Sequence, residues 1–544
     1  MDRQIKTIAV DLTPILPGGE NGGAKIFVLE LLVRLAEMVP KTQFILLTQA
    51  ASHEELASLD RSNMRRQMVI GPGTVNSLFS RLRGLVSHTL PYLPGRVRRV
   101  VSRLGYKLNT ILKRRKSGTL LRDISADLLF CPFTAPTYFE VGIPTVSTIY
   151  DLQYKTFPEF FAAEDVAHRD RTFLEACQKA TVLTAISDYS RDSAIVHGGL
   201  EPARIRTIHL RMAQRIAPED EQDTTILDRL KLTRQRYLMY PANFWRHKNH
   251  EMLMTAFGMA CHEGLAKDIK LVCTGAPGER YEWLMKAAYS MNLGDRIIFP
   301  GYLPNTELAA LMSHCVGVVF PSLYEGFGLP VIEAMAAGVP VACSNRTSLP
   351  EVAADAAIMF DPRIPTQISQ AMISLVENTE LRVQLIQAGL QRAEEFSDSM
   401  RMTREYWELF QFAFGNKNHE SLMTGIYQDG WSGSQINIQV GPTTSAQALE
   451  TAFTAPQHKV VIEAYFDGEA IQKPLLIQAG KEAVLSLPLE PQGGVYVLRV
   501  SPTFVPALIG LGEDQRELGA KVRRCGVSLD NGEYMPFYPE QVPA

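Results

Sequence analysis

The chain has 544 residues, of which 46% are hydrophobic and 21% charged. This length and balance predict two or three globular domains and exclude a largely disordered chain. The formal net charge of −3 argues against a general binder of polyanions.

The N-terminal part of the chain alternates short apolar runs with helical patterns. Ile5–Leu12 and Gln43–Thr48 are predicted buried strands, and Lys25–Glu37 between them has helical apolar spacing. A strand–helix–strand unit predicts a parallel sheet. Further strands are expected at Leu128–Cys131, Val146–Tyr150 and Val182–Ile186. We expect a Rossmann-like domain over residues 1–225.

The segment from Arg61 to Arg122 carries fifteen Lys or Arg and no Asp or Glu. Such a block is either a solvated face or a surface for an anionic partner, such as membrane headgroups or a lipid diphosphate. Aromatic residues are sparse there and no nucleic-acid-binding motif accompanies the charge, so nucleic acid is not the expected partner.

A second set of alternating elements follows the polar stretch Ala217–Thr233. The predicted strands are Tyr237–Tyr240, Ile269–Thr274, Ile297–Phe299, Gly317–Phe320 and Val341–Ser344. Helices are expected between them and at Pro365–Glu377, Glu380–Glu395 and Met400–Phe414. This pattern predicts a second Rossmann-like domain over residues 226–415.

Beyond residue 416 the pattern changes to short alternating strands separated by turns rich in Gly, Pro and Gln. The strands are expected at Gln435–Val440, Lys459–Phe466, Ala483–Leu487 and Gly494–Val500. No long helix intervenes, so residues 425–544 are predicted to form a separate β-rich, sandwich-like domain.

Seven cysteines are scattered along the chain without a C-x-x-C pair. Their odd number and spacing argue against a disulfide framework or a zinc site and favour a reducing compartment. The first ten residues lack the apolar core of a signal peptide, and no run approaches the roughly 18 apolar residues of a spanning helix. We expect a cytoplasmic protein, either free or peripheral on the inner face of the plasma membrane.

The segment from Glu325 to Glu333, Glu-Gly-Phe-Gly-Leu-Pro-Val-Ile-Glu, leaves a buried strand and enters a helix. Gly326 and Gly328 permit positive φ and close backbone approach. The amides of Phe327–Leu329 would be free at the helix N-terminus, where they and the helix dipole suit a diphosphate. Taken alone, the same residues could also be the ordinary start of a helix: a glycine turn, a proline at the first helical position and a glutamate favoured by the helix dipole.

Two glutamates flank this turn. Glu333 lies about one helical turn in, where its carboxylate can accept hydrogen bonds from both hydroxyls of a ribose. Glu325 lies on the loop and can hold the hydroxyls of a donor sugar. Their spacing resembles the E-x7-E motif of the retaining glycosyltransferases of family four, also called group one, which have the two-domain GT-B fold.

Further segments resemble this family over about residues 1–415. Gly22 and Gly23 resemble its N-terminal glycine loop, which opens onto the donor phosphate. The other matching segments are Tyr150-Asp-Leu-Gln-Tyr, Ala185-Ile-Ser-Asp-Tyr-Ser-Arg, Tyr240-Pro-Ala-Asn-Phe-Trp-Arg-His-Lys-Asn-His, Gly301-Tyr-Leu-Pro and Ser348-Leu-Pro-Glu-Val. The resemblance implies two Rossmann-like domains whose parallel sheets face a cleft, and a last helix near residues 400–415 that packs back on the first domain.

Lys248 matches the lysine that binds the donor diphosphate in this family. A cation there would offset the charge that builds on the leaving diphosphate. Many members carry an arginine five residues earlier, where this chain has Asn243. Arg246 is a candidate to supply the missing charge.

Tyr150 stands where the family usually has histidine, before Asp151, beside the transferred sugar. A tyrosine can donate a hydrogen bond but is a poor base near neutral pH, since its reference pKa is about 10. The leaving phosphate can take the acceptor proton instead, so activity can survive this change. Asp151 either orients the site or only caps the end of a strand.

The resemblance implies a retaining transferase that moves a hexose, with mannose favoured, from a GDP- or UDP-linked donor. The expected acceptor is a bacterial glycan or a polyprenyl-diphosphate-linked oligosaccharide in the biosynthesis of a cell-surface polysaccharide such as lipopolysaccharide. No cofactor and no metal are expected. The predicted catalytic residues are Glu325, Lys248, Tyr150 and Asp151. The predicted donor-binding residues are Gly22, Gly23, Asn243, Arg246, Lys248, Glu325, Gly326, Phe327, Gly328, Leu329 and Glu333.

Two other functions stay open at this point. One is a nucleotide-sugar epimerase of the same fold, which would change the sugar without an acceptor. The other is a non-catalytic glycan-binding or scaffold protein, suggested by Tyr150 and by the added β domain. In that domain, Ser501-Pro-Thr-Phe and Asp514-Gln-Arg-Glu-Leu-Gly resemble accessory modules of polysaccharide glycosyltransferases.

Overall fold

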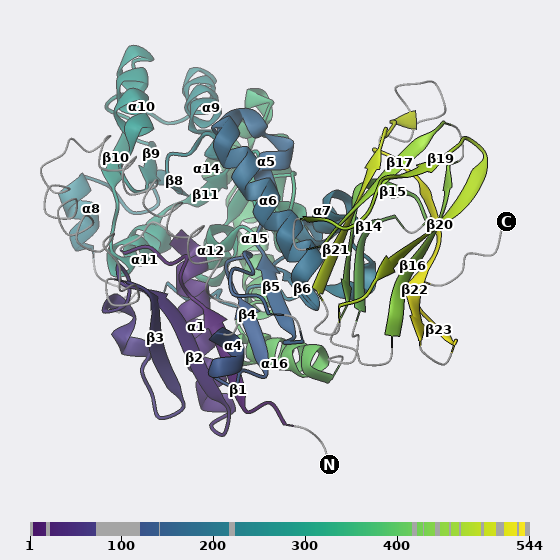
Figure 1. Cartoon of the computed structure of the whole chain (residues 1–544). Helices are drawn as coiled ribbons and strands as arrows, with labels where there is room; N and C mark the ends of the chain where they lie inside the picture. The colour runs from purple at the N-terminus through teal and green to yellow at the C-terminus, as the bar shows by residue number, and fades with distance from the viewer. Residues whose placement is uncertain are drawn as a thin grey trace, which may run out of the picture.

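The computed structural model describes residues 4–17, 22–71, 120–140, 142–216, 224–415, 421–427, 429–440, 446–455, 458–466, 469–490, 494–506, 516–529 and 532–538. Two parallel α/β domains stand against each other, and antiparallel sheets lie beside the first of them (Figure 1). This arrangement confirms the predicted combination of two Rossmann-like domains and a β-rich domain.

In the described part of the chain, seven parallel strands form the sheet of the first domain, in the order β3-β2-β1-β4-β5-β6-β7. Its inner strands are buried on both faces and are largely apolar. The strands are β1 Thr7–Asp11, β2 Gln43–Gln49, β3 Met64–Ile70, β4 Leu128–Cys131, β5 Thr145–Ile149, β6 Val182–Ala185 and β7 Ile205–Thr207.

The helices of this domain connect its parallel strands. They are α1 Gly22–Met38, α4 Leu120–Asp123, α5 Gln153–Thr156, α6 Ala163–Lys179 and α7 Asp188–Gly198, with the 3-10 turns η1 Glu55–Leu59, η3 Pro158–Phe160 and η4 Pro202–Arg204. The edge strands β3 and β7 were not among the predicted strands. They are only partly buried, so their sequences lack the continuous apolar signal.

Six parallel strands form the sheet of the second domain, in the order β10-β9-β8-β11-β12-β13. They are β8 Tyr237–Pro241, β9 Lys270–Thr274, β10 Ile297–Gly301, β11 Gly317–Phe320, β12 Val341–Ser344 and β13 Ala357–Phe360. The helices are α8 Thr225–Leu230, α9 His250–His262, α10 Glu279–Ser290, α11 Asn305–His314, α12 Leu329–Ala336, α13 Leu349–Ala353, α14 Pro365–Glu377 and α15 Thr379–Glu394, with turns η5 Arg246–Lys248 and η6 Ala354–Ala356.

The long helix α16, Ser399–Gly415, follows the second domain but packs on the first. Its buried face includes Tyr406 and Phe410, whose rings lie 5.8 and 5.0 Å from the ring of Phe130 on β4. Tyr406 also contacts Phe27 of α1 at 5.9 Å between ring centroids. The helix therefore ties the two parallel domains together through aromatic burial.

The C-terminal part forms two antiparallel sheets, ordered β14-β15-β21-β17-β18 with β19 beside β17, and β20-β16-β22-β23. Apolar residues of both sheets share one core, as in the predicted sandwich. The strands are β14 Ser421–Ile426, β15 Ser432–Val440, β16 Ala446–Ala455, β17 Val460–Phe466, β18 Glu469–Ala470, β19 Leu475–Ile477, β20 Lys481–Pro488, β21 Gly494–Ser501, β22 Lys521–Leu529 and β23 Tyr534–Tyr538.

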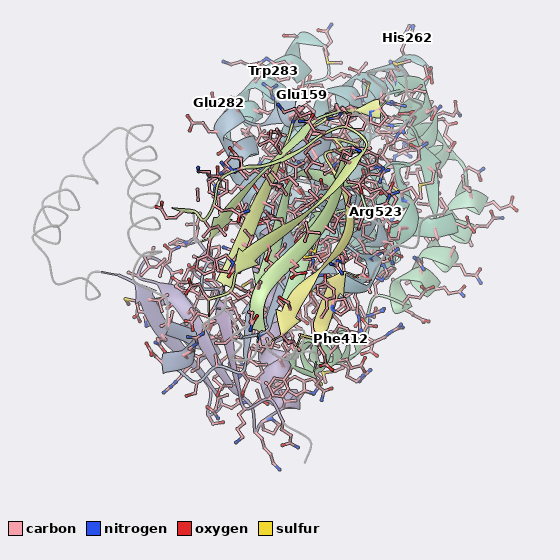
Figure 2. All side chains as sticks on the ribbon, turned by 45° about the vertical axis from the view of Figure 1, so that its right-hand side comes forward. Glu159, His262, Glu282, Trp283, Phe412 and Arg523 are labelled. Carbon is pink, nitrogen blue, oxygen red and sulfur yellow. The ribbon has the colours of Figure 1, made fainter. Side chains whose placement is uncertain are left out.

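Figure 2 brings these sheets forward and shows Arg523 of β22 among their side chains, far from Trp283 on α10 of the second domain. Within the sheets, Arg516 forms an ion pair with Asp429 at 2.7 Å. Asp514, in the same segment of the chain as Arg516, lies outside the described residues.

Most of the basic segment between Arg61 and Arg122 also lies outside the described residues. Among the helices that the structure describes, none combines the length and the apolar character needed to cross a membrane.

Candidate active site between the two parallel sheets

The E-x7-E segment connects β11 to α12 at the carboxyl end of the second sheet, where ligands of open α/β sheets usually bind. Glu325 lies on the loop and Glu333 on α12. Gly328 is the N-cap of α12 with φ +107°, a conformation that requires glycine, and a Cβ there would meet the Leu349 side chain at 2.6 Å. The turn therefore has the backbone that the sequence predicts at this position.

Lys248 and Glu325 are brought together across the second domain. The Lys248 Nζ lies 2.6 Å from Glu325 Oε1, and their side chains are 12% and 10% exposed. A lysine ammonium has three N–H donors, so this contact uses only one of them. The remaining donors are available to an anionic ligand beside Glu325.

Lys248 is held by the turn that precedes α9. The hydroxyl of Tyr240 on β8 donates to the Lys248 carbonyl at 2.8 Å. Asn249 adopts a left-handed conformation with φ +61°, and its side-chain amide donates to the carbonyls of Pro321 and Pro362 at 3.1 and 2.8 Å. These contacts fix the backbone at the lysine and directly after it.

Gly326 lies against the first domain. A Cβ at Gly326 would be 2.3 Å from the Tyr150 carbonyl oxygen and 3.1 Å from the Asp151 Cβ. Of the two uses of glycine considered for this turn, positive φ and close backbone approach, Gly326 shows the second, since it is not among the positive-φ glycines. Glycine is needed there because the backbones of the two domains approach too closely for a side chain.

Asp151 is close enough to Lys248 and Glu325 to interact with both charges. Burial raises the pKa of the Asp151 carboxyl, and the negative charge of Glu325 acts in the same direction. The Gln153 N–H, which donates to Asp151 Oδ1 at 3.0 Å, and the positive charges of Arg169 and Lys248 oppose this rise. The structure thus gathers three of the four predicted catalytic residues.

Tyr150 directs its side chain into the first domain. Its ring contacts Phe27 and Phe133 at 6.3 and 6.5 Å between centroids. The hydroxyl is buried and has no hydrogen-bond partner among the described residues, and burial raises its pKa well above the ordinary value. The tyrosine therefore stays protonated near neutral pH, with its hydroxyl inside the first domain.

The amides of Phe327, Gly328 and Leu329 are hydrogen-bonded to no other group in the described part of the chain. Gly23, at the start of α1, faces this turn, since a Cβ there would lie 3.6 Å from the Leu329 side chain. Gly22 precedes it with φ +53°. The N-terminal glycines and the start of α12 are thus neighbours, whereas the Phe327 ring packs away among Phe396 and His209.

Glu333 is almost completely buried, with 1% of the residue exposed. Arg215, in the segment between the domains, places Nε 2.6 Å from Glu333 Oε1. Burial raises the pKa of Glu333, and the charge and hydrogen bond of Arg215 oppose the rise. The carboxylate expected to receive a ribose therefore already has a cationic partner that the sequence did not indicate.

Asn243 and Arg246 do not reach Glu325 by any described contact. Asn243 Oδ1 accepts a hydrogen bond from the Ala276 N–H at 2.8 Å and so holds the loop after β9. Arg246 is exposed at the start of η5. Burial lowers the pKa of Arg280, which is ion-paired with Glu251, and the charge of Arg246 acts in the same direction. Arg246 and Arg280 form a cationic pair beside the turn that carries Lys248.

The loop after β12 supports the Glu325 loop. Thr347 Oγ1 accepts a hydrogen bond from the Glu325 N–H at 3.0 Å, and Ser348 Oγ lies 3.0 and 2.9 Å from the carbonyls of Glu325 and Phe327. Thr347 has φ +58°, which is an outlier for a β-branched residue. These supporting residues were not predicted, although Ser348 begins one of the segments that match the family.

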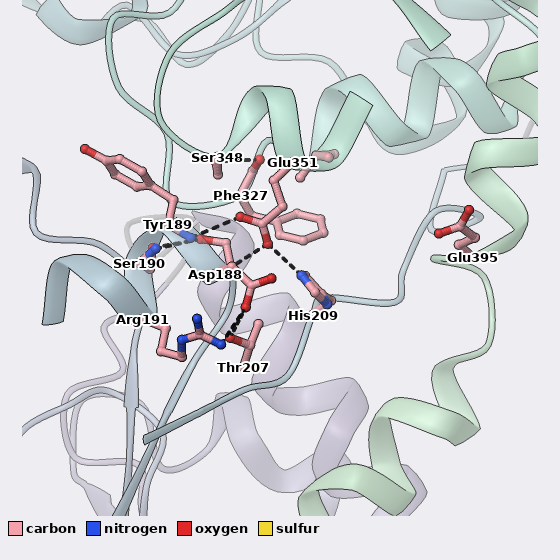
Figure 3. Close-up of polar contacts among 12 residues, drawn as sticks. Asp188, Tyr189, Ser190, Arg191, Thr207, His209, Phe327, Ser348, Glu351 and Glu395 are labelled. Atoms are coloured by element: carbon pink, nitrogen blue, oxygen red, sulfur yellow. Dashed lines mark hydrogen bonds and ion pairs between the residues drawn. The ribbon is translucent and has the colours of Figure 1, made fainter. Parts of the chain in front are cut away.

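One group of side chains has the composition of a metal site: Asp188, His209 and Glu351, with ligand atoms within 4.8 Å of one another (Figure 3). Each carboxylate already accepts hydrogen bonds from protein groups. Asp188 accepts from the Thr207 hydroxyl at 2.6 Å, and Glu351 from the backbone amides of Asp188 and Tyr189. Protein donors therefore satisfy this cluster, which connects the two domains.

Comparison with known proteins gives the site its context. The family described as "Glycosyl transferases group 1" matches residues 222–392. The O-antigen chain mannosyltransferase B of Escherichia coli is 30% identical over 289 residues, which cover 53% of this chain and 75% of that protein. The serotype-specific mannosyltransferase WbdA of Escherichia coli is 29% identical over 224 residues, which cover 40% of this chain and 27% of that protein.

Solved structures with low sequence identity share the fold. HepE of Anabaena, in complex with UDP and glucose, has a TM-score of 0.54 at 14% identity, covering 75% of this chain and 100% of that one. Sucrose-phosphate synthase of Thermosynechococcus elongatus has a TM-score of 0.54 at 18% identity, covering 76% and 100%. This likeness confirms the GT-B fold for the two parallel domains. The family itself is shown by the relative that is 30% identical and covered to 75% of its length, together with the family match over residues 222–392. The chain belongs to the group 1 glycosyltransferases.

Proposed function

We propose that this enzyme is a retaining glycosyltransferase that moves a hexose, with mannose favoured, from a nucleoside diphosphate sugar to a bacterial glycan or lipid-linked oligosaccharide. The observation that carries the proposal is the 2.6 Å contact between Lys248 and Glu325 beside the start of α12, whose first amides have no partner among the described residues. A cation, a helix N-terminus and a carboxylate meet there, as a charged diphosphate and a polar sugar require.

The proposed mechanism assigns each group one role. The α12 amides and Lys248 hold the diphosphate, and Glu325 holds sugar hydroxyls. The bond between the anomeric carbon and the phosphate oxygen breaks, and the acceptor hydroxyl oxygen forms the new bond on the same face. Because burial keeps Tyr150 protonated, this side chain cannot act as the base, and the leaving phosphate oxygen takes the acceptor proton.

Mannose is favoured because both reported bacterial relatives are described as mannosyltransferases. HepE has been crystallised with UDP and glucose, so both GDP- and UDP-linked donors belong in the test. The word O-antigen in the name of one relative supports an acceptor in cell-surface polysaccharide synthesis.

The acceptor side of the proposal includes contact with a membrane through the basic segment between Arg61 and Arg122. A lipid-linked acceptor is presented at a bilayer whose anionic headgroups attract clustered Lys and Arg. Replacing Arg96, Arg98 and Arg99 by Glu should reduce binding to vesicles that contain anionic lipid. Unchanged vesicle binding and unchanged KM for a lipid-linked acceptor would remove this part of the proposal.

A thermal-shift screen against GDP, UDP, ADP and their sugars tests the donor site. A ligand that binds the folded state raises the melting temperature as its concentration increases. We expect a saturable increase with a nucleoside diphosphate or its hexose. The increase should become smaller in K248Q and remain in the matched control K286Q, which replaces an exposed lysine on α10. Equal responses of wild type and K248Q would contradict the assigned diphosphate site.

A further inference from the structure

Glu351 on α13 of the second domain binds the first turn of α7 in the first domain. Its Oε1 accepts a hydrogen bond from the Asp188 N–H at 2.7 Å, and its Oε2 accepts one from the Tyr189 N–H at 3.0 Å. His209 Nε2, in the segment between the domains, lies 2.6 Å from Glu351 Oε1. Figure 3 shows these contacts converging on the Glu351 carboxylate.

The contact has the chemistry of a helix cap supplied from another domain. The first amides of an α-helix have no partner within the helix, and a carboxylate there also interacts favourably with the helix dipole. The side chain of Ser187, the N-cap residue of α7, accepts a hydrogen bond from the Ser190 N–H at 3.1 Å. Glu351 accepts hydrogen bonds from the two preceding amides of this turn, those of Asp188 and Tyr189.

The capped end of α7 also touches the loop that carries Glu325. Ser190 Oγ lies 2.9 Å from the Tyr150 carbonyl oxygen and 3.3 Å from that of Gly326. The rings of Tyr189 and Tyr324 meet edge to face, with centroids 5.7 Å apart. The same turn of helix thus contacts both Glu351 and the Glu325 loop.

A second contact joins the domains on the other side of this loop. The Tyr324 hydroxyl accepts a hydrogen bond from the Leu152 N–H at 3.2 Å, one residue after Asp151. Asp151 comes from the first domain, whereas Lys248 and Glu325 come from the second. These three groups can act on one substrate only when the domains are docked as the contacts hold them.

We propose that Glu351 is a positioning residue for sugar transfer, because its cap on α7 holds the first domain against the Glu325 loop. The inference rests on the proposed function for its kinetic part. Glu351 contacts Asp188, Tyr189, His209 and, through its backbone carbonyl, Arg392, and none of these is among the residues predicted to bind the donor. Its loss should therefore impair transfer more than nucleotide binding.

The test compares E351A and E351Q with the matched control D355N, an exposed carboxylate on η6 of the same connection. For E351A we expect kcat to fall about tenfold or more, because two charge-assisted hydrogen bonds are lost. The Kd for the nucleoside diphosphate should stay within about threefold of wild type, since Lys248 and α12 are untouched. The kcat of E351Q, which keeps one acceptor oxygen, should lie between those of E351A and wild type. The kcat and Kd of D355N should match those of wild type.

Small-angle X-ray scattering supplies a readout that does not depend on activity. E351A should have a larger radius of gyration than wild type and D355N, because the docked arrangement becomes less populated. If E351A does not fold, E351Q carries the same comparison with smaller changes. A kcat of E351A and E351Q within twofold of wild type would overturn the inference. A nucleoside diphosphate Kd that is tenfold weaker in these variants would also overturn it, because Glu351 would then belong to the donor-binding residues. Failure of the wild-type enzyme to transfer any sugar would instead contradict the proposed function, while the scattering comparison would still test the docking.

Discussion

Arg215 and Glu333 form an ion pair in which Nε lies 2.6 Å from Oε1, and Glu333 is the carboxylate expected to receive the donor ribose. Arg215 belongs to the segment between the domains, and Glu333 to α12. An unpaired charge at a site with 1% exposure is costly, so the pairing stabilises the structure described above. A ribose that binds both oxygens of this carboxylate must compete with Arg215.

The competition predicts an effect of R215A that depends on the ribose hydroxyls. Without the guanidinium, Glu333 gains more from a ribose diol, so a nucleoside diphosphate should bind about five- to tenfold more tightly. The 2′-deoxynucleoside diphosphate, which lacks one of the two hydroxyls, should gain less. Isothermal titration calorimetry with both ligands measures the difference. R215K keeps the charge and serves as the control. Equal weakening of both ligands by R215A would contradict the competition.

The Thr347 hydroxyl is expected to support turnover by holding the Glu325 N–H. T347V removes the hydroxyl but keeps the β-branched shape, so kcat for donor turnover should fall about five- to tenfold, as one supporting hydrogen bond is worth about 1–1.5 kcal/mol. T347S keeps the hydroxyl and should stay within about threefold of wild type. Steady-state release of nucleoside diphosphate measures both. A T347V enzyme as active as T347S would show that the hydroxyl does not position Glu325.

Asp11 predicts a pH dependence of stability. It lies buried at the carboxyl end of β1, where the Thr13 N–H and hydroxyl donate to Oδ1, and burial raises its pKa to about 6. The folded state therefore holds this proton more tightly than the unfolded state, whose pKa is near 3.8. The resulting stabilisation is complete below about pH 4 and is lost as the pH rises through about 6. The shift corresponds to at most about 3 kcal/mol.

The variant D11N isolates this contribution, because asparagine keeps the Oδ1 acceptor and cannot ionise. The melting temperature of D11N minus that of wild type should be larger at pH 7.5 than at pH 4.5, by a few degrees. Differential scanning calorimetry at both pH values provides the comparison, since other titrating groups affect both proteins alike. A difference that does not change between these pH values would contradict the raised pKa.

The charge at the proposed diphosphate site predicts independence from divalent metal. Lys248 and the start of α12 supply the positive charge that Mg²⁺ supplies in other phosphate sites. Turnover of the donor should therefore continue in excess EDTA at a rate within about twofold of that in Mg²⁺. Loss of turnover in EDTA, with recovery on addition of Mg²⁺, would contradict the assignment.

Much of the fold follows from local sequence patterns. Gly317–Phe320 and Val341–Ser344 agree with β11 and β12 residue for residue, because central parallel strands are continuous apolar runs bounded by turns. The edge strand β13, Ala357–Phe360, escaped prediction because only one of its residues is fully buried. Local composition therefore predicts such partly buried edge strands poorly.

Less of the candidate site could be predicted from local sequence patterns, because its contacts join distant parts of the chain. The turn at Gly328 has the predicted geometry, whereas the role of Gly326 depends on the Tyr150 carbonyl in another domain. The partner of Glu333 is 118 residues away, and the amides bound by Glu351 are more than 160 residues away. No pattern within one element encodes such pairs.

The variant E325Q tests most directly whether this chain transfers a sugar from a nucleoside diphosphate sugar with the help of Glu325. The measurement is the initial rate of nucleoside diphosphate release from GDP-mannose and UDP-glucose, with lipid-linked glycan extracted from bacterial membranes as acceptor. Wild type and the control E307Q should release the nucleotide from one of these donors in an acceptor-dependent way, and E325Q should be slower by about a hundredfold or more. Equal rates for E325Q and wild type would contradict the account, because the carboxylate beside Lys248 would then have no part in transfer.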